Sequence, residues 1–186
     1  MARKKAPRRK ASGAARTARK RSLEAVGAFP AEHFDDRLQL ELRRAERYFV
    51  FLSLLLADCD VAEFKGGRWR RRKGRDHVPD IGAALKANTR DIDTLFVYEK
   101  DKMAFILPET NDEGAFEAAQ RLRRIVEATK FPRFGKNFRI RVAFGVSSFP
   151  SDARTKTQLL TRAQKGLKVA VKEMFHKLPE HPPSRH

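Results

Sequence analysis

The chain has 186 residues and a formal net charge of +18, which allows one ordinary domain with a tail but leaves little room for two separate cores. Its single cysteine, Cys59, excludes an intrachain disulfide, and no Cys/His cluster has the spacing of zinc ligands. The longest apolar run, residues 48–57, is far shorter than the roughly 20 residues of a membrane-spanning helix, so we expect no integral membrane protein.

The positive charge is concentrated in two segments. Ten cations and no acid lie before residue 23, and seven more cations lie between residues 65 and 75, so the rest of the chain is close to neutral. Residues 1–28 have almost no large apolar side chains, and we expect them to form a disordered basic tail. The Pro-rich residues 178–186 are predicted to be a second disordered end, which leaves residues 29–177 as the domain.

The N-terminus lacks the apolar stretch of a secretory signal, which favours a cytoplasmic protein.

Both basic segments are suited to bind nucleic acid or another polyanion, with an affinity that falls steeply with salt. Trp69, among the arginines of the second segment, could stack on a base or insert at a membrane surface. The alternatives are a tail that only solubilises the chain and a tryptophan that packs on the domain edge. The residues expected to contact the polyanion are Arg8, Arg9, Lys10, Arg19, Lys20, Arg21, Arg68, Trp69, Arg70, Arg71, Arg72 and Lys73.

The first predicted elements are a helix and a buried strand. Asp35 or Asp36 is expected to cap the helix, whose inner face repeats apolar residues at helical spacing. These apolar residues are Leu38, Leu42 and Ala45. Residues 50–57 are continuously apolar, with β-branched and aromatic side chains at their start, which indicates a central strand covered on both faces. A loop rich in Gly and Arg is expected over residues 65–75.

A second helix is predicted around residues 80–89. Residues 94–98 and 103–107 then indicate two strands joined by the charged turn 99–102. This hairpin lacks the Asn-Gly or Asp-Gly pair that is usual in tight hairpin turns.

Three further elements complete the predicted domain. Thr110 has capping-box spacing to Glu113, and an amphipathic helix follows it. Residues 138–147 alternate as a strand does, and Thr155 is expected to cap the final amphipathic helix. The resulting order favours an α/β (α+β) domain, with a single mixed or antiparallel sheet flanked by helices.

Three segments resemble the diguanylate cyclase, or GGDEF, family, whose members condense two GTP molecules into cyclic di-GMP. Residues 52–60 (LSLLLADCD) resemble the first strand of the family and its Asp-x-Asp end. Residues 104–110 (AFILPET) resemble the strand after the signature loop, and residues 143–150 (AFGVSSFP) resemble the late strand. The resemblance covers roughly residues 34–175 and implies the nucleotide-cyclase fold, a ferredoxin-like palm.

This alignment puts the signature pentapeptide on Glu99-Lys100-Asp101-Lys102-Met103, which differs from the family pattern at four of its five residues. The glycines of the family let the backbone approach a triphosphate, whereas residues with a Cβ obstruct that approach. The resemblance leaves Asp58 and Asp101 at the metal positions, so Mg²⁺ is expected only if this vestigial site functions. The alternative is that Asp58 simply ends a strand and Asp101 lies in an exposed turn.

The groups that recognise the nucleotide in the family are also replaced. Gly66-Gly-Arg-Trp-Arg-Arg-Arg-Lys-Gly74 stands where the family has its guanine-contacting segment, Gly74-Arg75 replaces a Gly-Asp pair, and the phosphate-binding lysine of the last helix falls on Val171. Because phosphoryl transfer depends on such positioning groups acting together, we expect no cyclase activity and no required cofactor.

The resemblance also implies a binding site for cyclic di-GMP. Arg90 and Asp93 match the Arg-x-x-Asp inhibitory site, at the correct offset from the signature position. An arginine can fork onto a guanine edge or a phosphate, and a carboxylate can accept hydrogen bonds from guanine N1 and N2. The alternative is a surface ion pair of little energetic weight.

The leading interpretation is a catalytically inactive GGDEF-like module that binds cyclic di-GMP, or a protein partner, and reaches a polyanion through its basic segments. The alternatives are a nucleic-acid-associated protein that uses the fold as a scaffold, and an enzyme that still processes a nucleotide through Asp58 and Asp101.

Overall fold

The computed structural model describes residues 27–71, 78–99, 102–132, 134–135 and 137–176. The predicted disordered ends therefore lie almost entirely outside the described residues. Among the described helices, none has the length and hydropathy that crossing a membrane requires.

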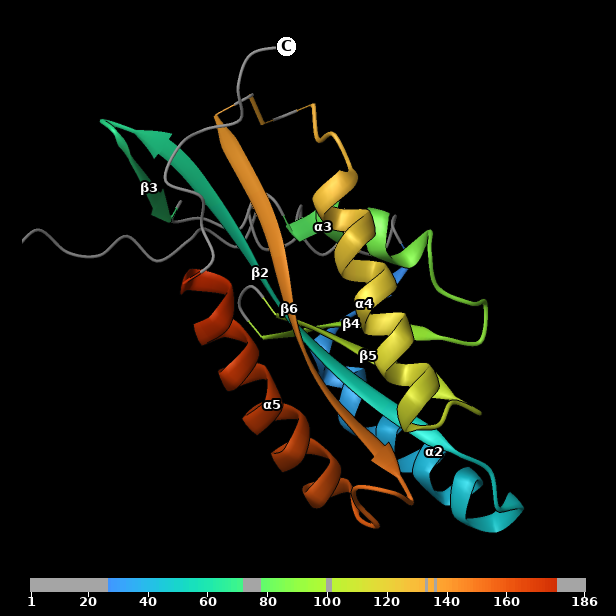
Figure 1. The fold of residues 1–186 in the computed structure, drawn as a ribbon. Coiled ribbons are helices and arrows are strands. Elements are labelled where there is room, and N and C mark those ends of the chain that lie inside the picture. The colour runs from blue at the N-terminus through green and yellow to red at the C-terminus, as the bar shows by residue number, and fades with distance from the viewer. Residues whose placement is uncertain (1–26, 72–77, 100–101, 133, 136, 177–186) are drawn as a thin grey trace, which may run out of the picture.

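The described chain forms one six-stranded sheet and four α-helices, which confirms the predicted fold class (Figure 1). The strands run in the spatial order β1 (Ala28–Phe29), β4 (Thr94–Glu99), β5 (Lys102–Pro108) and β2 (Leu52–Lys65). β6 (Phe138–Phe149) pairs with the opposite edge of β2, and β3 (Arg68–Arg71) pairs with the far end of β2. All pairings are antiparallel except β1 with β4.

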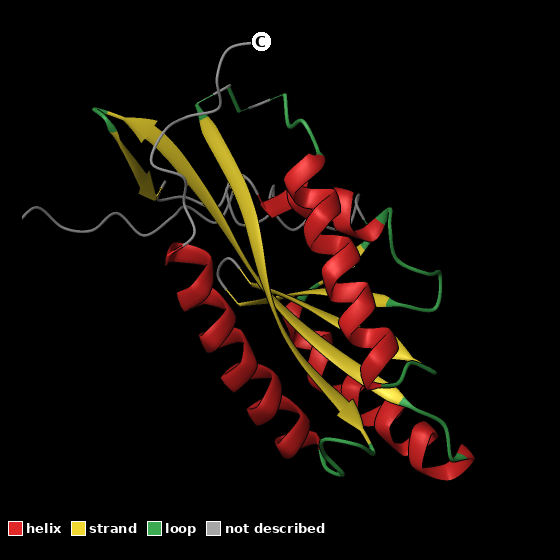
Figure 2. Cartoon of the chain, in the orientation of Figure 1, coloured by secondary structure: helices red, strands yellow, loops and turns green. Residues whose placement is uncertain are grey.

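The helices cover both faces of the sheet, so the domain has two apolar cores. Helices α3 (Val78–Lys86) and α4 (Asp112–Ala128) cover one face, while α2 (Phe34–Tyr48) and α5 (Lys156–His176) cover the other (Figures 1 and 2).

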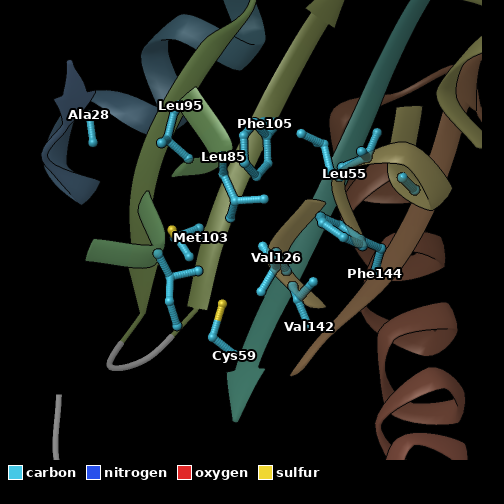
Figure 3. Close-up of a cluster of buried hydrophobic side chains, with 14 of the residues drawn as sticks. Ala28, Leu55, Cys59, Leu85, Leu95, Met103, Phe105, Val126, Val142 and Phe144 are labelled. Atoms are coloured by element: carbon cyan, nitrogen blue, oxygen red, sulfur yellow. The ribbon is translucent and has the colours of Figure 1, made fainter. Parts of the chain in front are cut away.

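Strand β2 supplies both cores with alternate side chains, as the period of two in a strand requires. Leu55 and Cys59 point into the first core, where they meet residues such as Phe105 and Phe144 (Figure 3). Leu54 and Leu56 belong to the second core, and of these six side chains all but Phe144 are at most 1% exposed. The continuous apolar run in the sequence is therefore explained by burial on both faces.

The strand prediction was correct in kind but too short. β2 begins at Leu52 and continues to Lys65, well past the predicted end at Ala57. Its polar half persists as a strand because β6 pairs with it continuously, from Leu52↔Phe149 to Glu63↔Phe138. Inter-strand hydrogen bonding, rather than the apolar pattern, extends the strand.

Two helix caps differ from the prediction. Asp35 and Asp36 do not cap α2, because the 3₁₀ turn Ala31–His33 leads directly into the helix and places both aspartates in its first turn. There their charges still favour the positive end of the helix dipole. Asn111, not Thr110, caps α4 by accepting a hydrogen bond from the Gly114 backbone at 2.9 Å.

The Thr155 cap is confirmed, because its hydroxyl accepts a hydrogen bond from the Gln158 backbone at 3.2 Å. Helix α5 then packs on β6 at Gly145. A Cβ built on Gly145 would overlap the Ala163 carbonyl oxygen and the Leu167 backbone nitrogen. These atoms belong to the helix backbone, so they cannot move aside as a flexible side chain would.

We therefore expect Gly145→Ala to lower the free energy of unfolding by about 2–3 kcal/mol, the usual cost of overpacking a core. Urea unfolding measures this change. The matched control is Gly135→Ala, where an added Cβ has no neighbour within 4 Å and the expected change is at most about 0.5 kcal/mol. Equal effects of the two substitutions would contradict the close approach of α5 to β6.

Candidate functional site

The charged β4–β5 hairpin meets β2 beside Asp58. The strand register pairs Asp58 with Lys102 and Ala57 with Met103, so the beginning of β5 lies against the middle of β2. The Lys102 ammonium donates a hydrogen bond to Glu99 Oε2 at 2.8 Å, which closes the base of the turn with an ion pair. Asp101, the second carboxylate predicted at this place, lies outside the described residues, as does Lys100.

Lys102 lies opposite Asp58, so it brings a positive charge close to the carboxylate that the sequence suggested as a metal ligand. The pKa of Lys102 is raised, first by its hydrogen bond to Glu99 and further by the negative charges of Glu99 and Asp58, while burial opposes the shift. Across the described ranges, no three His, Cys, Asp or Glu side chains gather as metal ligands would.

The first part of the predicted Gly- and Arg-rich loop instead forms a second hairpin, which joins β2 to β3. Gly66 and Gly67 have φ of 63° and 76°, the left-handed pair that a tight two-residue turn needs. β3 then returns along β2, and the ring of Trp69 contacts that of Phe64 edge-on, with centroids 5.3 Å apart. Cross-strand pairing of aromatic rings stabilises such a hairpin, which the composition alone did not indicate.

This β2–β3 hairpin carries part of the predicted polyanion surface. Arg68 and Arg70 are exposed, whereas Trp69 is only partly so, in agreement with a tryptophan that packs on the domain edge. Of the other polyanion candidates, Arg71 belongs to β3, and Arg72, Lys73 and the tail residues lie outside the described residues. The tail residues concerned are Arg8, Arg9, Lys10, Arg19, Lys20 and Arg21.

Arg90 and Asp93 form a closed turn just before β4. The Arg90 backbone N–H donates to Asp93 Oδ2 at 2.8 Å, and the Asp93 N–H donates back to the Arg90 carbonyl at 3.1 Å. Asp93 is only 6% exposed, whereas Arg90 is exposed. Nη1 of Arg90 lies 3.5 Å from Thr110 Oγ1. The contact between the two residues therefore uses the backbone of Arg90 and leaves most of its guanidinium available.

Cations from two other elements influence the Asp93 carboxylate. Burial raises the pKa of Asp93, and the Arg90 backbone hydrogen bond and the charges of Arg90, Lys86 and Arg121 oppose that rise. Lys86 ends α3 and donates from Nζ to the Asp93 carbonyl at 2.8 Å, whereas Arg121 belongs to α4. Sequence reasoning missed both, because only the packing of the two helices brings them to the turn.

Asp93 also has unused capacity to accept a hydrogen bond. Its Oδ1 is buried and receives none from the described part of the chain. A pocket of about 740 Å³ borders this turn, between α2 and the end of α3. Apolar, basic and acidic side chains line it, among them Phe29, Phe96, Arg37, Lys86, Glu41 and Asp93 itself.

The candidate residues thus fall into two separate places. Asp58 and Lys102 lie at the turn end of β5, whereas Arg90 and Asp93 precede the start of β4, at the opposite end of the same hairpin. The structure does not bring them together, so they are two distinct sites.

Comparison with known proteins gives one family. The profile described as "Diguanylate cyclase, GGDEF domain" matches residues 31–177. Diguanylate cyclase A of Treponema denticola is 27% identical over 116 residues, which are 62% of this chain and 31% of the relative. Diguanylate cyclase DosC of Escherichia coli K12 is 26% identical over 110 residues, which are 59% of this chain and 24% of the relative. The matched region spans less than a third of the length of either relative.

Solved structures share the fold at low identity. The GGDEF domain of YfiN from Pseudomonas aeruginosa superposes with a TM-score of 0.65 at 17% identity, over 80% of this chain and 92% of that one. The GGDEF domain of DgcB from Caulobacter crescentus, solved in complex with c-di-GMP, gives 0.61 at 15%, over 78% and 86%.

The raised pKa of Asp93 predicts a pH-dependent effect of Asp93→Asn. The amide oxygen can still accept from the Arg90 N–H, but the buried charge is gone. The pKa of Asp93 in the folded protein lies above the ordinary value of 3.8. The wild type therefore loses stability as the pH rises from about 3.8 through the folded-state pKa of Asp93. We expect the variant, relative to wild type, to gain stability across that window and to keep a constant difference above it.

Urea unfolding of both proteins over a pH series measures this difference. A wild type that instead gains stability over the variant as the pH rises would show that the neighbouring cations outweigh burial.

Proposed function

The chain belongs to the GGDEF family of diguanylate cyclase domains, and on that premise we propose that it is a catalytically inactive member that acts as a signalling module by binding cyclic di-GMP at Arg90 and Asp93. The observation that carries this proposal is the buried Asp93 carboxylate, which has an unused acceptor oxygen beside an exposed arginine.

The signature turn lacks the features that cyclase activity needs. Glu99 and Lys102 form an ion pair across the turn, at the place where the family binds a triphosphate. The Glu99 carboxylate would repel the phosphates. The residues that replace the two glycines of the family each carry a Cβ, which hinders the close backbone approach that glycine permits. Lys102 already supplies a cation next to Asp58, so we propose that the protein requires no Mg²⁺.

The nucleotide base would also lack its partners. The β2–β3 hairpin occupies the stretch of sequence that supplies guanine contacts in the family, and it presents arginines and the Phe64–Trp69 ring pair instead. Val171, at the family's phosphate-binding lysine, packs against the second core. Because positioning groups act together in phosphoryl transfer, losing several of them removes turnover rather than slowing it slightly.

Receptor chemistry is better supported than catalysis. Asp93 Oδ1 can accept from guanine N1 or N2, and the Arg90 guanidinium can fork onto a guanine edge or a phosphate. Lys86 and Arg121 add positive charge near the turn, which favours a ligand with two phosphates. The DgcB domain of the same fold was solved in complex with c-di-GMP, which is compatible with this chemistry.

A second activity, polyanion binding, is favoured by the β2–β3 hairpin. The hairpin projects beyond the helices (Figure 2), its Arg68 and Arg70 are exposed, and the tail carries ten further cations in the sequence. We propose that both segments bind nucleic acid in the cytoplasm, with an affinity set mainly by phosphate neutralisation.

Isothermal titration with cyclic di-GMP tests the receptor proposal. We expect Arg90→Ala to weaken binding about tenfold or more, because a charge-assisted hydrogen bond to the ligand is lost. The matched control is Arg162→Ala on α5, whose side chain is 61% exposed and lies 4.0 Å from Asp152 in a loose ion pair. The control should bind as the wild type does.

Binding heats that are identical in wild type and Arg90→Ala would overturn the assignment to this site. Separately, incubation of the wild type with GTP and Mg²⁺ tests inactivity, and formation of cyclic di-GMP would refute it.

The polyanion proposal predicts a steep salt dependence of DNA binding. The logarithm of the affinity should fall against the logarithm of the salt concentration with a slope of about 0.9 per phosphate contacted. Deleting residues 1–22 should flatten this slope markedly, and Arg68→Gln with Arg70→Gln should reduce it by about 2. Lys165→Gln with Lys168→Gln, on α5, is the charge-matched control. Fluorescence anisotropy measures the binding, and a salt-independent affinity would exclude the proposal.

A further inference from the structure

The exposed apolar side chains of the described residues cluster on α2 and at its two ends. Eight large apolar residues are exposed in the described part of the chain, and five of them lie on this helix or directly beside it. These five are Phe29, Leu40, Tyr48, Phe49 and Phe51. A cluster on one element is typical of an interaction surface, whereas exposed apolar residues that are scattered singly need no explanation.

Phe49 is the most exposed of the five, and folding alone does not account for it. It ends α2 in the left-handed conformation, with φ of 56°, where glycine is the favoured residue and a side chain adds strain. The residue is 95% exposed, so its ring gains no burial within the chain in return. A contact with another molecule would supply that burial.

The charges on the outward face of α2 are separated along the helix. Asp36, Leu40, Arg43 and Arg47 follow one another at intervals of four, three and four residues, which is the spacing of a seam between paired helices. All four are exposed, and the acid lies in the first turn whereas the arginines lie in the second half. The helix dipole favours the same distribution of charge, but it does not explain why the apolar Leu40 is exposed in the middle of this seam.

The other charged groups of α2 have partners within the chain or lie off the seam. Arg37 and Arg44 both pair with the buried Glu41, at 2.8 and 3.3 Å. Three further acids lie on the flank of α2 that faces α5 or just after β5. These are Asp35, Glu46 and Glu109. The surface as a whole therefore has no excess of either sign, and what distinguishes it is the separation of the two signs along the seam.

The seam is complementary to itself when two copies of α2 run in opposite directions. A two-fold axis that passes between Leu40 and Arg43 places Asp36 beside Arg47 of the second copy, and it does so twice. It also places Leu40 against the aliphatic stem of Arg43. Glu32, which is exposed in the turn before α2, lies in the same acidic half as Asp36. Opposite charges thus face one another along the pair of helices.

The aromatic residues at the ends of α2 fit the same arrangement. Antiparallel pairing brings Phe49 of one copy to the beginning of α2 in the other. Phe29 is 52% exposed there, and its ring packs on that of Phe96 with centroids 5.7 Å apart. Phe49 therefore gains an apolar neighbour, and this burial offsets the strain of its left-handed backbone.

We propose that α2 pairs with α2 of a second copy of this chain, in an antiparallel dimer with two-fold symmetry. The surface is small and partly polar, so the dimer is weak and depends on concentration. The ten cations before residue 23 do not oppose it, because antiparallel pairing leaves the two sets before opposite ends of a helix pair about 22 Å long. That length exceeds two Debye lengths of about 8 Å each at physiological salt.

Sedimentation velocity of the full chain, over a concentration series at physiological salt and without nucleotide, tests the dimer. We expect a reversible equilibrium between monomer and dimer. Phe49→Gly should raise the dissociation constant about tenfold or more, because each dimer loses two buried phenyl rings. Its melting temperature should stay equal or rise, because glycine suits the left-handed position, so a folding defect is separated from the loss of association.

Charge exchange tests the direction of the pairing. Arg43→Glu with Arg47→Glu makes the seam acidic throughout, and Glu32→Lys with Asp36→Lys makes it basic throughout. Each double variant alone should associate at least tenfold more weakly than wild type, because like charges then face one another, and an equimolar mixture of the two should recover association. Val169→Ala, on α5, is the matched control: this residue is 58% exposed, and its loss should leave the dissociation constant within twofold.

Three outcomes would overturn the proposal. A wild type that stays monomeric up to about 1 mM, the range of very weak complexes, has no such interface. A dimer whose dissociation constant is unchanged by Phe49→Gly uses another surface. A mixture of the two charge variants that stays monomeric shows that the helices do not pair in the antiparallel direction.

Discussion

The pairing of β2 with three other strands is the constraint on which the rest of the structure depends. β5 and β6 hydrogen-bond to its two edges over the apolar half, and β6 and β3 do so over the polar half. Its alternate side chains fill both cores, so each helix packs on a surface that β2 helps to form. Because a slip of one residue would exchange the two faces, the register also determines where every functional side chain lies.

That register places the charged groups of the signature turn in contact with β2. Lys102 lies opposite Asp58 and bonds to Glu99, so positive charge is supplied by the chain itself. Under the proposed function, Lys102 stands where the family binds a metal ion, so the Lewis acid is lost while a cation beside the Asp58 carboxylate is kept. The proposed inactivity and the stability of the fold then have one physical origin.

The proposed binding surfaces are separated along the same framework. Asp93 lies before β4, whereas the basic hairpin extends the far end of β2. A small ligand and a nucleic acid could each be bound without competing for the same side chains.

The sequence by itself determined the element order, the double burial of the central strand and the family, because apolar periodicity and contiguous motifs are local signals. It also located Arg90 and Asp93, whose mutual contact spans only three residues. Only the tertiary structure decided that residues 58–65 continue as a strand, that Lys86 and Arg121 reach Asp93, and that Phe49 stays in water. These features arise from inter-strand pairing and helix packing between segments distant in the chain, and no local pattern encodes them.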